Sequence, residues 1–186
     1  GESLVVCGSN NKALQILTNK INDALGAYNH TININNPLNI FMSDDEGITK
    51  LVKEMSSGKG PDTVIFTGTN PAYTLPNADE FTKALAKVKN KISLSSHADE
   101  TASLCDVIVP DHHALEGWMD YQPTLTHYAL AQPTIRPLGN TASSIESFLV
   151  WAGKASRGGK DSKVAYDYIK NIWIQWGFPE QTEYTD

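Results

Sequence analysis

This sequence of 186 residues has few cysteines, no cluster of basic residues and no long apolar run. Its two cysteines, Cys7 and Cys105, lie at the ends of expected core segments, so we predict buried free thiols rather than a disulfide framework or a metal knuckle. The 21 acidic and 15 basic residues give a formal charge of −6, and no basic cluster indicates a nucleic-acid partner. No apolar run approaches the roughly 18 residues of a membrane span, so we expect no direct membrane insertion.

The length and composition fit one globular domain of a longer protein. A chain of 186 residues, of which 40% are hydrophobic, can bury a continuous core. Gly1 stands directly before an apolar segment, which is typical of a fragment, so a targeting signal of the parent chain would not be visible here. We therefore expect residues 1–186 to form a single domain of a larger protein.

Residues 1–110 alternate short apolar runs with helical patterns. Strands are expected at 4–7, 31–34, 39–42, 63–67, 91–95 and 107–109, and helices at 14–25, 43–57 and 77–88. Ser43 and Glu46 form a capping box for the second helix, and Asp99 caps a further short turn of helix. Strands separated by helices predict βαβ units. The fold class is therefore α/β, a three-layer Rossmann-like domain with a mainly parallel sheet.

The chain changes character after this βαβ core. Residues 111–142 contain three prolines and little periodicity, which predicts a long extended loop wrapping the sheet. Within it, residues 118–138 are expected to expose apolar side chains that pack on neighbouring domains of the parent chain. C-terminal helices are expected within 143–178, at 144–152 and at 162–176.

Polar loops follow three of the expected strands. In an open parallel sheet, ligands bind beyond the carboxyl ends of the strands, where glycine allows close approach and Ser, Thr and Asn bind phosphate or sugar oxygens. The candidate binding residues are Gly8, Ser9 and Asn10, then Gly68, Thr69, Asn70 and Pro71, then Ser95, Glu100 and Thr101. Neither a GxGxxG nor a GxxxxGK[ST] motif is present, and composition alone favours ordinary loop chemistry over a nucleotide site.

Two other kinds of site are weighed and set aside. His112, His113, Asp106, Asp111 and His127 carry side chains that can bind a metal. Zinc needs three or four converging ligands, but the adjacent His112 and His113 point apart in an extended chain. We therefore expect no metal site. Ser95, Ser96, His97 and Asp99 include the side chains of a hydrolase triad. They lack a Gly-x-Ser-x-Gly elbow and lie too close in sequence for a relay, so capping and turn roles are the better interpretation. No catalytic residue is assigned.

One family resemblance is carried by two motifs in the middle of the chain. The Gly68-Thr69-Asn70-Pro71 loop resembles the Gly-x-Asn-Pro that follows a strand in the third domain of molybdopterin oxidoreductases of the dimethyl sulfoxide reductase type. Residues 99–110, read as DETASLCDVIVP, and the following Glu116-Gly117 are similar to that family's Glu-Thr-Ala signature. The resemblance implies an α/β domain that helps to hold the guanosine diphosphate arm of a molybdopterin guanine dinucleotide, with the ten candidate residues around it.

Departures from the family pattern narrow the resemblance. Residues 118–123, residues 127–138 and the Asp111-His112-His113 segment look like the large iron–sulfur subunit of alternative complex III. That resemblance implies a subunit of an extracytoplasmic, periplasmic membrane complex that oxidises quinol and serves electron transport. Its partners would be other domains of the parent chain and membrane-complex subunits, and it would lack the molybdenum cofactor. Ser95 stands where ordinary members often carry an acidic residue, which argues against selective guanine recognition.

Three functions remain open at this point. The first is a non-catalytic structural and docking domain of such an electron-transfer complex; the second is a molybdopterin guanine dinucleotide-binding domain of an active molybdenum oxidoreductase. A third is an unrelated α/β small-molecule binder. The sequence has no CxxC cluster motif, so iron–sulfur clusters are expected only in other domains of the parent. We expect no cofactor chemistry and no turnover from this domain alone.

Overall fold

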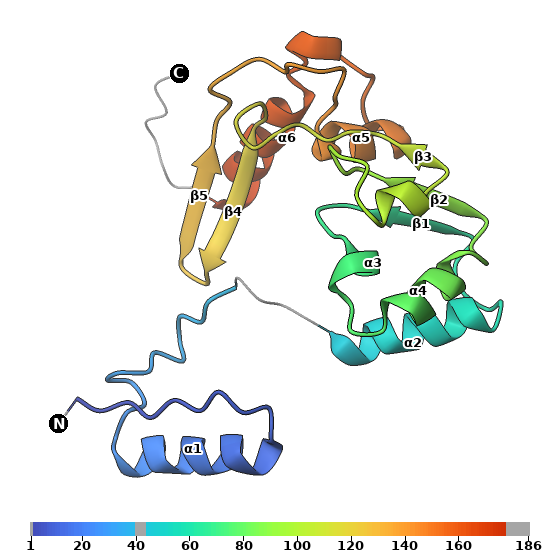
Figure 1. Ribbon diagram of the computed structural model, residues 1–186. Coiled ribbons are helices and arrows are strands. Elements are labelled where there is room, and N and C mark those ends of the chain that lie inside the picture. Colours follow the sequence, from blue (N-terminus) through green and yellow to red (C-terminus); the bar gives the residue numbers. More distant parts are fainter. Residues whose placement is uncertain (1, 40–43, 178–186) are drawn as a thin grey trace. The chain divides into compact units, whose positions relative to one another are not determined.

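The chain divides into two compact units. The computed structural model describes residues 2–39 and 44–177. Unit 1 comprises Gly1–Met42 and Tyr121–Ala129, and unit 2 comprises Ser43–Asp120 and Leu130–Asp186. Figure 1 labels the elements of both units along the chain. None of the helices within the described ranges is both long and apolar enough to cross a membrane.

The described part of unit 1 contains the helix α1 (Lys12–Ala24), which confirms the expected helix. The Asn11 side chain caps it by accepting hydrogen bonds from the backbone N–H groups of Ala13 and Leu14. The chain then leaves the helix at Gly26, which adopts a φ of 67°, a value that glycine reaches without strain. The sequence therefore encodes both ends of α1.

The strand predicted at 4–7 is wrong. Residues 4–7 are extended but pair with no strand among the residues that the structure describes. The buried side-chain amide of Asn22 takes the place of a neighbouring strand: its Oδ1 accepts from Val5 N–H at 2.8 Å, and its Nδ2 donates to Val5 O at 2.9 Å. The segment thus satisfies this backbone against α1 rather than in a sheet.

Of the other two strands predicted in unit 1, the one at 31–34 does not form, and the one at 39–42 lies mostly outside the described residues. Ile32 makes only an isolated bridge with Tyr28, because residues 27–32 form tight turns around Ala27. Of the strand predicted at 39–42, residues 40–42 lie outside the described residues, and Asn39 N–H donates to Pro123 O.

Unit 2 is built on a parallel sheet. The strands β1 (Thr63–Phe66), β2 (Asn90–Ser93) and β3 (Val107–Ile108) lie in the order β1-β2-β3, with Thr63 opposite Asn90 and Ile92 opposite Val107. The helical elements of this part are α2 (Asp45–Ser56), α3 (Pro71–Thr74), α4 (Ala78–Leu85) and η1 (Ala102–Leu104). The predicted α/β class and parallel sheet are confirmed.

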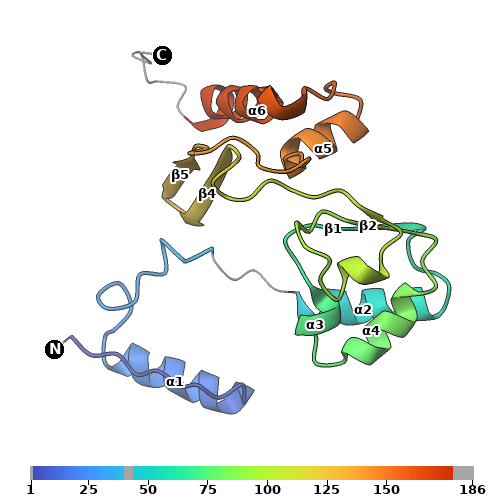
Figure 2. The same ribbon diagram turned by 45° about the horizontal axis from the view of Figure 1, so that its top comes forward.

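The core of unit 2 lies where α2 and α4 cover one face of this sheet (Figure 2). Phe66 of β1 and Phe81 of α4 meet edge to face with ring centroids 6.1 Å apart, and Met55 of α2 is 2% exposed beside them. Alternation along β1 puts Ile65 on the opposite face, where it is 37% exposed. The sheet is therefore buried mainly on its helix-covered side.

The N-cap of α2 is one residue away from the predicted position, whereas the predicted cap of η1 forms. Asp44, not Ser43, is the N-cap of α2: its Oδ1 accepts from Gly47 N–H at 2.8 Å, and Ser43 lies outside the described residues. Asp99 caps η1 as predicted, accepting from Ala102 N–H at 2.8 Å. At the start of α4, Asn77 bonds the Glu80 side chain instead of the backbone.

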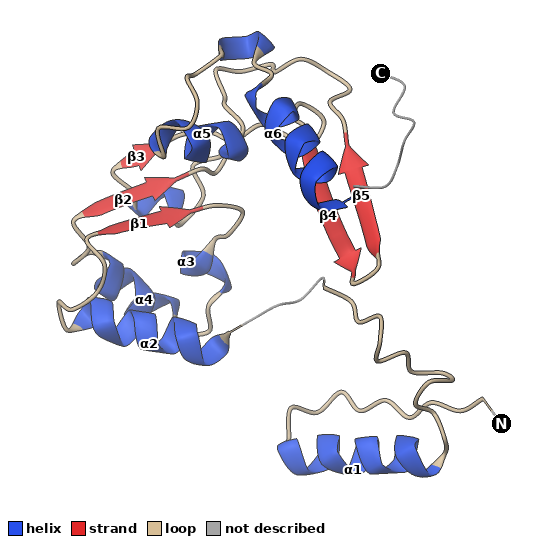
Figure 3. Cartoon of the chain, turned by 180° about the vertical axis from the view of Figure 1, so that it is seen from behind, coloured by secondary structure: helices blue, strands red, loops and turns tan. Residues whose placement is uncertain are grey.

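The long loop predicted at 111–142 contains two paired strands, which the sequence analysis did not predict. These are β4 (Met119–Thr124) and β5 (His127–Ala131), joined by only two residues, Leu125 and Thr126 (Figure 3). The usual Gly or Asn turn signal is absent. Instead, the Asn36 side chain accepts hydrogen bonds from Thr126 N–H at 3.2 Å and from its hydroxyl at 3.0 Å. A distant residue therefore stabilises this turn.

The C-terminal helices form close to the predicted positions. They are α5 (Ser144–Trp151), the short η2 (Gly159–Asp161), α6 (Val164–Ile172) and the π-helical η3 (Trp173–Gly177). Ser143 caps α5 by accepting from Glu146 N–H at 3.1 Å, and Asp111, just after β3, accepts from Ser144 N–H at 2.8 Å. The start of α5 is thus fixed to the end of the sheet.

Candidate functional site

The polar loops after β1 and β2 meet, because parallel strands present their carboxyl ends at one edge of a sheet. Asn70, from the first loop, joins Glu100 and Thr101, from the second. Asn70 Nδ2 donates to Glu100 Oε2 at 2.7 Å, while Asn70 Oδ1 accepts from Thr101 N–H at 3.1 Å and from Thr101 Oγ1–H at 2.7 Å. Both ends of the Asn70 amide are therefore engaged within the chain.

The network continues into the start of α3. The hydroxyl oxygen of Thr101, a residue with 0% exposure, accepts from Ala72 N–H at 2.9 Å. Pro71 has no N–H group, and Tyr73 N–H donates to Asn70 O. The first backbone donors of α3, which an anion would need, are thus satisfied by the protein itself.

The charge at this site is negative. The hydrogen bond from Asn70 lowers the pKa of the exposed Glu100 carboxyl, and the backbone N–H of Glu100 lowers it further. An ionised carboxylate beside the loop disfavours a diphosphate there. Gly68 has a φ of 62°, and a Cβ built on it would meet nothing within 4 Å, so the turn itself accounts for this glycine. The residues present therefore fit a diphosphate group poorly.

The loop after β2 is held by local bonds. Ser95 Oγ accepts from His97 N–H at 3.3 Å, and Ser96 Oγ lies 2.9 Å from His97 Nδ1. Asp99 Oδ1 accepts from Ala102 N–H and so caps η1. These contacts support turn and cap roles for the residues of the hypothetical triad.

The remaining predicted binding residues belong to unit 1. Ser9 Oγ accepts from Asn11 N–H at 3.1 Å, and the Gln15 side chain donates to the carbonyl oxygens of Cys7 and Ser9. Gly8, Ser9 and Asn10 thus belong to a different unit from the other seven candidate residues. Within unit 2, the structure brings together Asn70, Pro71, Glu100 and Thr101, with Gly68, Thr69 and Ser95 in the same two loops.

The residues considered as metal ligands have other partners. Asp106 pairs with Lys91 at 3.0 Å and accepts its backbone N–H at 2.8 Å, and these bonds lower the pKa of Asp106. His112 Nδ1 bonds the Thr141 hydroxyl, and His127 Nδ1 lies 2.7 Å from the Thr124 hydroxyl. Over residues 2–39 and 44–177, no group of three or more His, Cys, Asp or Glu residues is placed to hold a metal ion.

The two thiols are free, as predicted, but each is half-buried rather than buried. Cys105 packs at the margin of the core, where its Sγ lies 3.4 Å from Thr101 O, and burial raises the pKa of its thiol. Cys7 lies in the extended segment beside α1, where alternate residues face solvent. Cys7 lies outside any helix or strand and Cys105 directly follows η1, and each position leaves the residue half-buried.

Sequence reasoning missed the structural role of Glu116, which is 9% exposed. Its two carboxylate oxygens accept backbone hydrogen bonds from Leu138 N–H and His113 N–H, each at 3.0 Å, and these bonds lower its pKa. The carboxylate thereby ties together two irregular segments 22 residues apart. Nothing in the local spacing indicates this partner.

A parallel sheet with a polar cluster at its strand ends defines an α/β domain of the class that presents ligand sites at that edge. The family model for molybdopterin oxidoreductases matches residues 8–142, and the chain belongs to this family. The predicted family resemblance is thereby confirmed. The chain is also 32% identical over 115 residues to the menaquinone reductase, molybdopterin-binding-like subunit of Nitratidesulfovibrio vulgaris (strain Hildenborough). The match covers 59% of this chain and 17% of that relative.

Proposed function

We propose that this chain is a non-catalytic docking domain in the molybdopterin-oxidoreductase-like subunit of a quinone-linked respiratory complex. The family membership and the relative, named as a menaquinone reductase subunit, support the link to quinone chemistry. The finer proposal is a periplasmic complex of the alternative complex III type that oxidises quinol. It rests on the segments at 111–138 that resemble that complex.

The observation that carries a non-catalytic role is the closed network at the strand ends. Asn70 and Thr101 use their polar atoms on each other, on Glu100 and on Ala72. An incoming diphosphate would have to replace these bonds beside a carboxylate, and each replaced bond would have to be recovered from the ligand. This arrangement supports a structural role for the two strand-end loops rather than a ligand-binding role.

The docking role is supported by apolar side chains left exposed along the segment predicted to contact neighbours. In unit 1 these are Tyr121, Leu125 and Tyr128; in unit 2 they are Leu130, Ile135 and Leu138. Leu138 is 82% exposed, and apolar surface exposed together in this way is typical of a contact with another domain or protein. We propose other domains of the parent chain and membrane-complex subunits as the partners.

The second candidate, a molybdopterin guanine dinucleotide-binding domain, is supported by membership of the molybdopterin oxidoreductase family. In that case the loops named in the sequence analysis would hold the cofactor: Gly8, Ser9, Asn10, Gly68, Thr69, Asn70, Pro71, Ser95, Glu100 and Thr101. When bound, the cofactor would supply redox chemistry at molybdenum. The chain's own residues would only bind and orient its nucleotide arm.

Calorimetric titration with guanosine diphosphate and adenosine diphosphate separates the two candidates. We expect dissociation constants of about 1 mM or weaker for both, equal within about twofold, because backbone donors at strand ends do not select a base. Substitution of Asn70 by Ala should leave this weak binding unchanged. Micromolar binding that prefers guanine and is lost in Asn70→Ala would establish the cofactor-binding candidate instead.

The docking role is tested separately in the intact parent complex. Leu138→Asp should reduce the yield of assembled complex, because it places a charge in an apolar contact. Tyr73→Asp is the matched control, since Tyr73 is also a large, exposed side chain (72%) of unit 2 but lies in α3, outside the docking segment. Equal yields for the two variants would contradict the proposal.

A further inference from the structure

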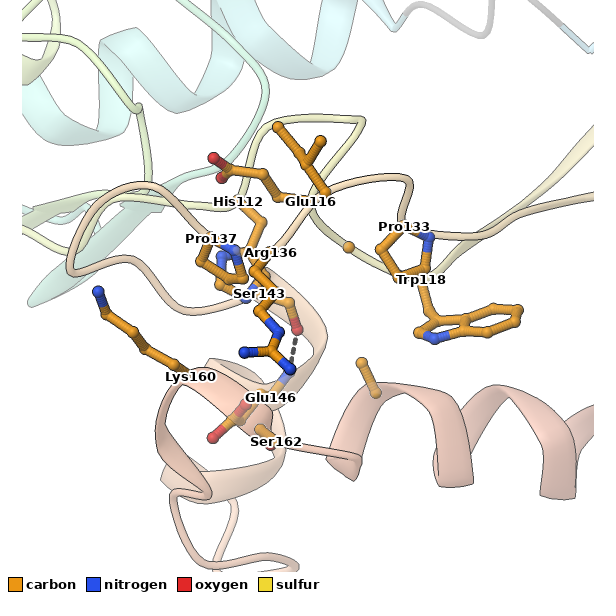
Figure 4. A pocket seen from close by; sticks show the side chains of 13 residues that line it. His112, Glu116, Trp118, Pro133, Arg136, Pro137, Ser143, Glu146, Lys160 and Ser162 are labelled. Carbon is orange, nitrogen blue, oxygen red and sulfur yellow. Dashed lines mark hydrogen bonds between the residues drawn. The ribbon is translucent and has the colours of Figure 1, made fainter.

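Unit 2 contains a cavity of about 140 Å³ that shares no lining residue with the strand-end loops. Its walls come from residues 112–118, residues 133–137, the start of α5 and the region around η2 (Figure 4). Pockets that hold drug-sized ligands and cofactors typically measure about 300–1,000 Å³. This cavity therefore suits a group of a few heavy atoms rather than a nucleotide.

Two cationic side chains line the cavity. Arg136 is one of only two arginines in the sequence, and it is among the lining residues labelled in Figure 4. Lys160, from η2, lines the same cavity. No carboxylate among the described residues lies within 4.0 Å of either charged group, so neither cation is neutralised by an ion pair in this part of the chain. Guanidinium and ammonium groups together suit an oxyanion.

The two carboxylates that line the cavity are held by backbone donors. Glu116 accepts the N–H groups of His113 and Leu138, and Glu146 Oε1 accepts Gly158 N–H at 2.8 Å. Backbone groups therefore engage these carboxylate oxygens, and, in the part of the chain that the structure describes, neither carboxylate forms an ion pair with Arg136 or Lys160.

Apolar side chains form another part of the wall, which also includes His112, Ser143 and Ser162. Trp118 packs against Tyr166 with ring centroids 4.9 Å apart, and its indole lines the cavity together with Ile135 and Ala165. A ligand that carries a short apolar group next to its anionic head would bury that group on this wall.

We propose that this cavity binds the oxyanion group of a small molecule, a carboxylate or a phosphate, through Arg136 and Lys160. Such a site is distinct from the strand-end crevice and does not depend on whether that crevice binds a nucleotide.

The test is a titration of the isotope-labelled 186-residue chain, followed by amide and indole N–H chemical shifts at constant ionic strength. The probes are sodium acetate, sodium butyrate and inorganic phosphate. We expect saturable shifts at the Trp118 indole and at the amides of residues 144–147. Butyrate binding more tightly than acetate or phosphate would identify a carboxylate on an apolar group, and phosphate binding most tightly would identify a phosphate.

Matched variants decide whether the cavity is responsible. Arg136→Gln and Lys160→Gln should each weaken binding about tenfold, as loss of one charge-assisted hydrogen bond does. Arg157→Gln and Lys154→Gln remove the same charges outside the cavity lining and should leave binding within about twofold. Absence of saturable shifts with all three probes, or equal weakening in the cavity and control variants, would overturn the proposal.

Discussion

Replacing Thr101 by Val tests the network at the strand ends most directly, because Val keeps the shape of Thr and removes only the hydroxyl. Thr101 is fully buried, and its Oγ1 donates to Asn70 Oδ1 at 2.7 Å and accepts from Ala72 N–H at 2.9 Å. The substitution deletes two hydrogen bonds and leaves Ala72 N–H without its acceptor. A net hydrogen bond contributes about 1 kcal/mol, and an unsatisfied buried group costs about 1–3 kcal/mol. We expect the free energy of unfolding of unit 2 to fall by about 2–3 kcal/mol.

The assay is urea unfolding followed by tryptophan fluorescence. All four tryptophans lie in the range of unit 2, so the signal reports on that unit. Thr74→Val is the matched control, since the exposed Thr74 bonds the Asn70 carbonyl from the solvent side and its loss should change stability by less than about 0.5 kcal/mol. The denaturant slope should stay unchanged in both variants. A Thr101→Val chain as stable as the Thr74→Val chain would refute the structural role of the network.

Two further predictions follow from perturbed groups. Backbone hydrogen bonds hold the folded-state pKa of Glu116 below its ordinary value, so this carboxylate stabilises the fold above that ordinary pKa, and the contribution is lost as the pH falls through the folded-state pKa. Between pH 7 and pH 3, the urea midpoint of the wild-type chain should therefore fall further than that of Glu116→Gln; equal falls would argue against the role of this carboxylate. Burial raises the pKa of Cys105, so its thiol should react with a disulfide reagent at pH 8 several-fold more slowly in the folded chain of a Cys7→Ser variant than in urea. Equal rates in the two states would contradict this.

The elements that could be predicted from the sequence are those whose signals are local. The amphipathic pattern and Asn11 cap mark α1, and Asp99 marks the start of η1. The apolar runs of β1 and β2 are bounded by turn residues, and both strands form within two residues of the expected positions. Each of these signals depends on neighbours within four residues, which a sequence displays directly.

The features that could not be predicted depend on distant partners. Residues 4–7 have the pattern of a strand, but Asn22 satisfies Val5 instead. The turn between β4 and β5 has no local turn residue, because Asn36 supplies the stabilising contacts from 90 positions away. At the candidate site, the family motifs predicted which loops matter. That Asn70 and Thr101, 31 positions apart, would bond each other became visible only in the structure.

Asp111 has a consequence for the order in which unit 2 assembles. Its carboxylate reaches Ser144, 33 positions along the chain, and so places one of the capping groups of α5 at the end of β3. An isolated helix of eight residues is marginal in water, and α5 has that length. We expect α5 to form after the sheet during folding and to unfold before the sheet does. In hydrogen exchange, the first amides of α5 should then lose protection at a lower free energy than those of β2, and Asp111→Ala should widen that difference.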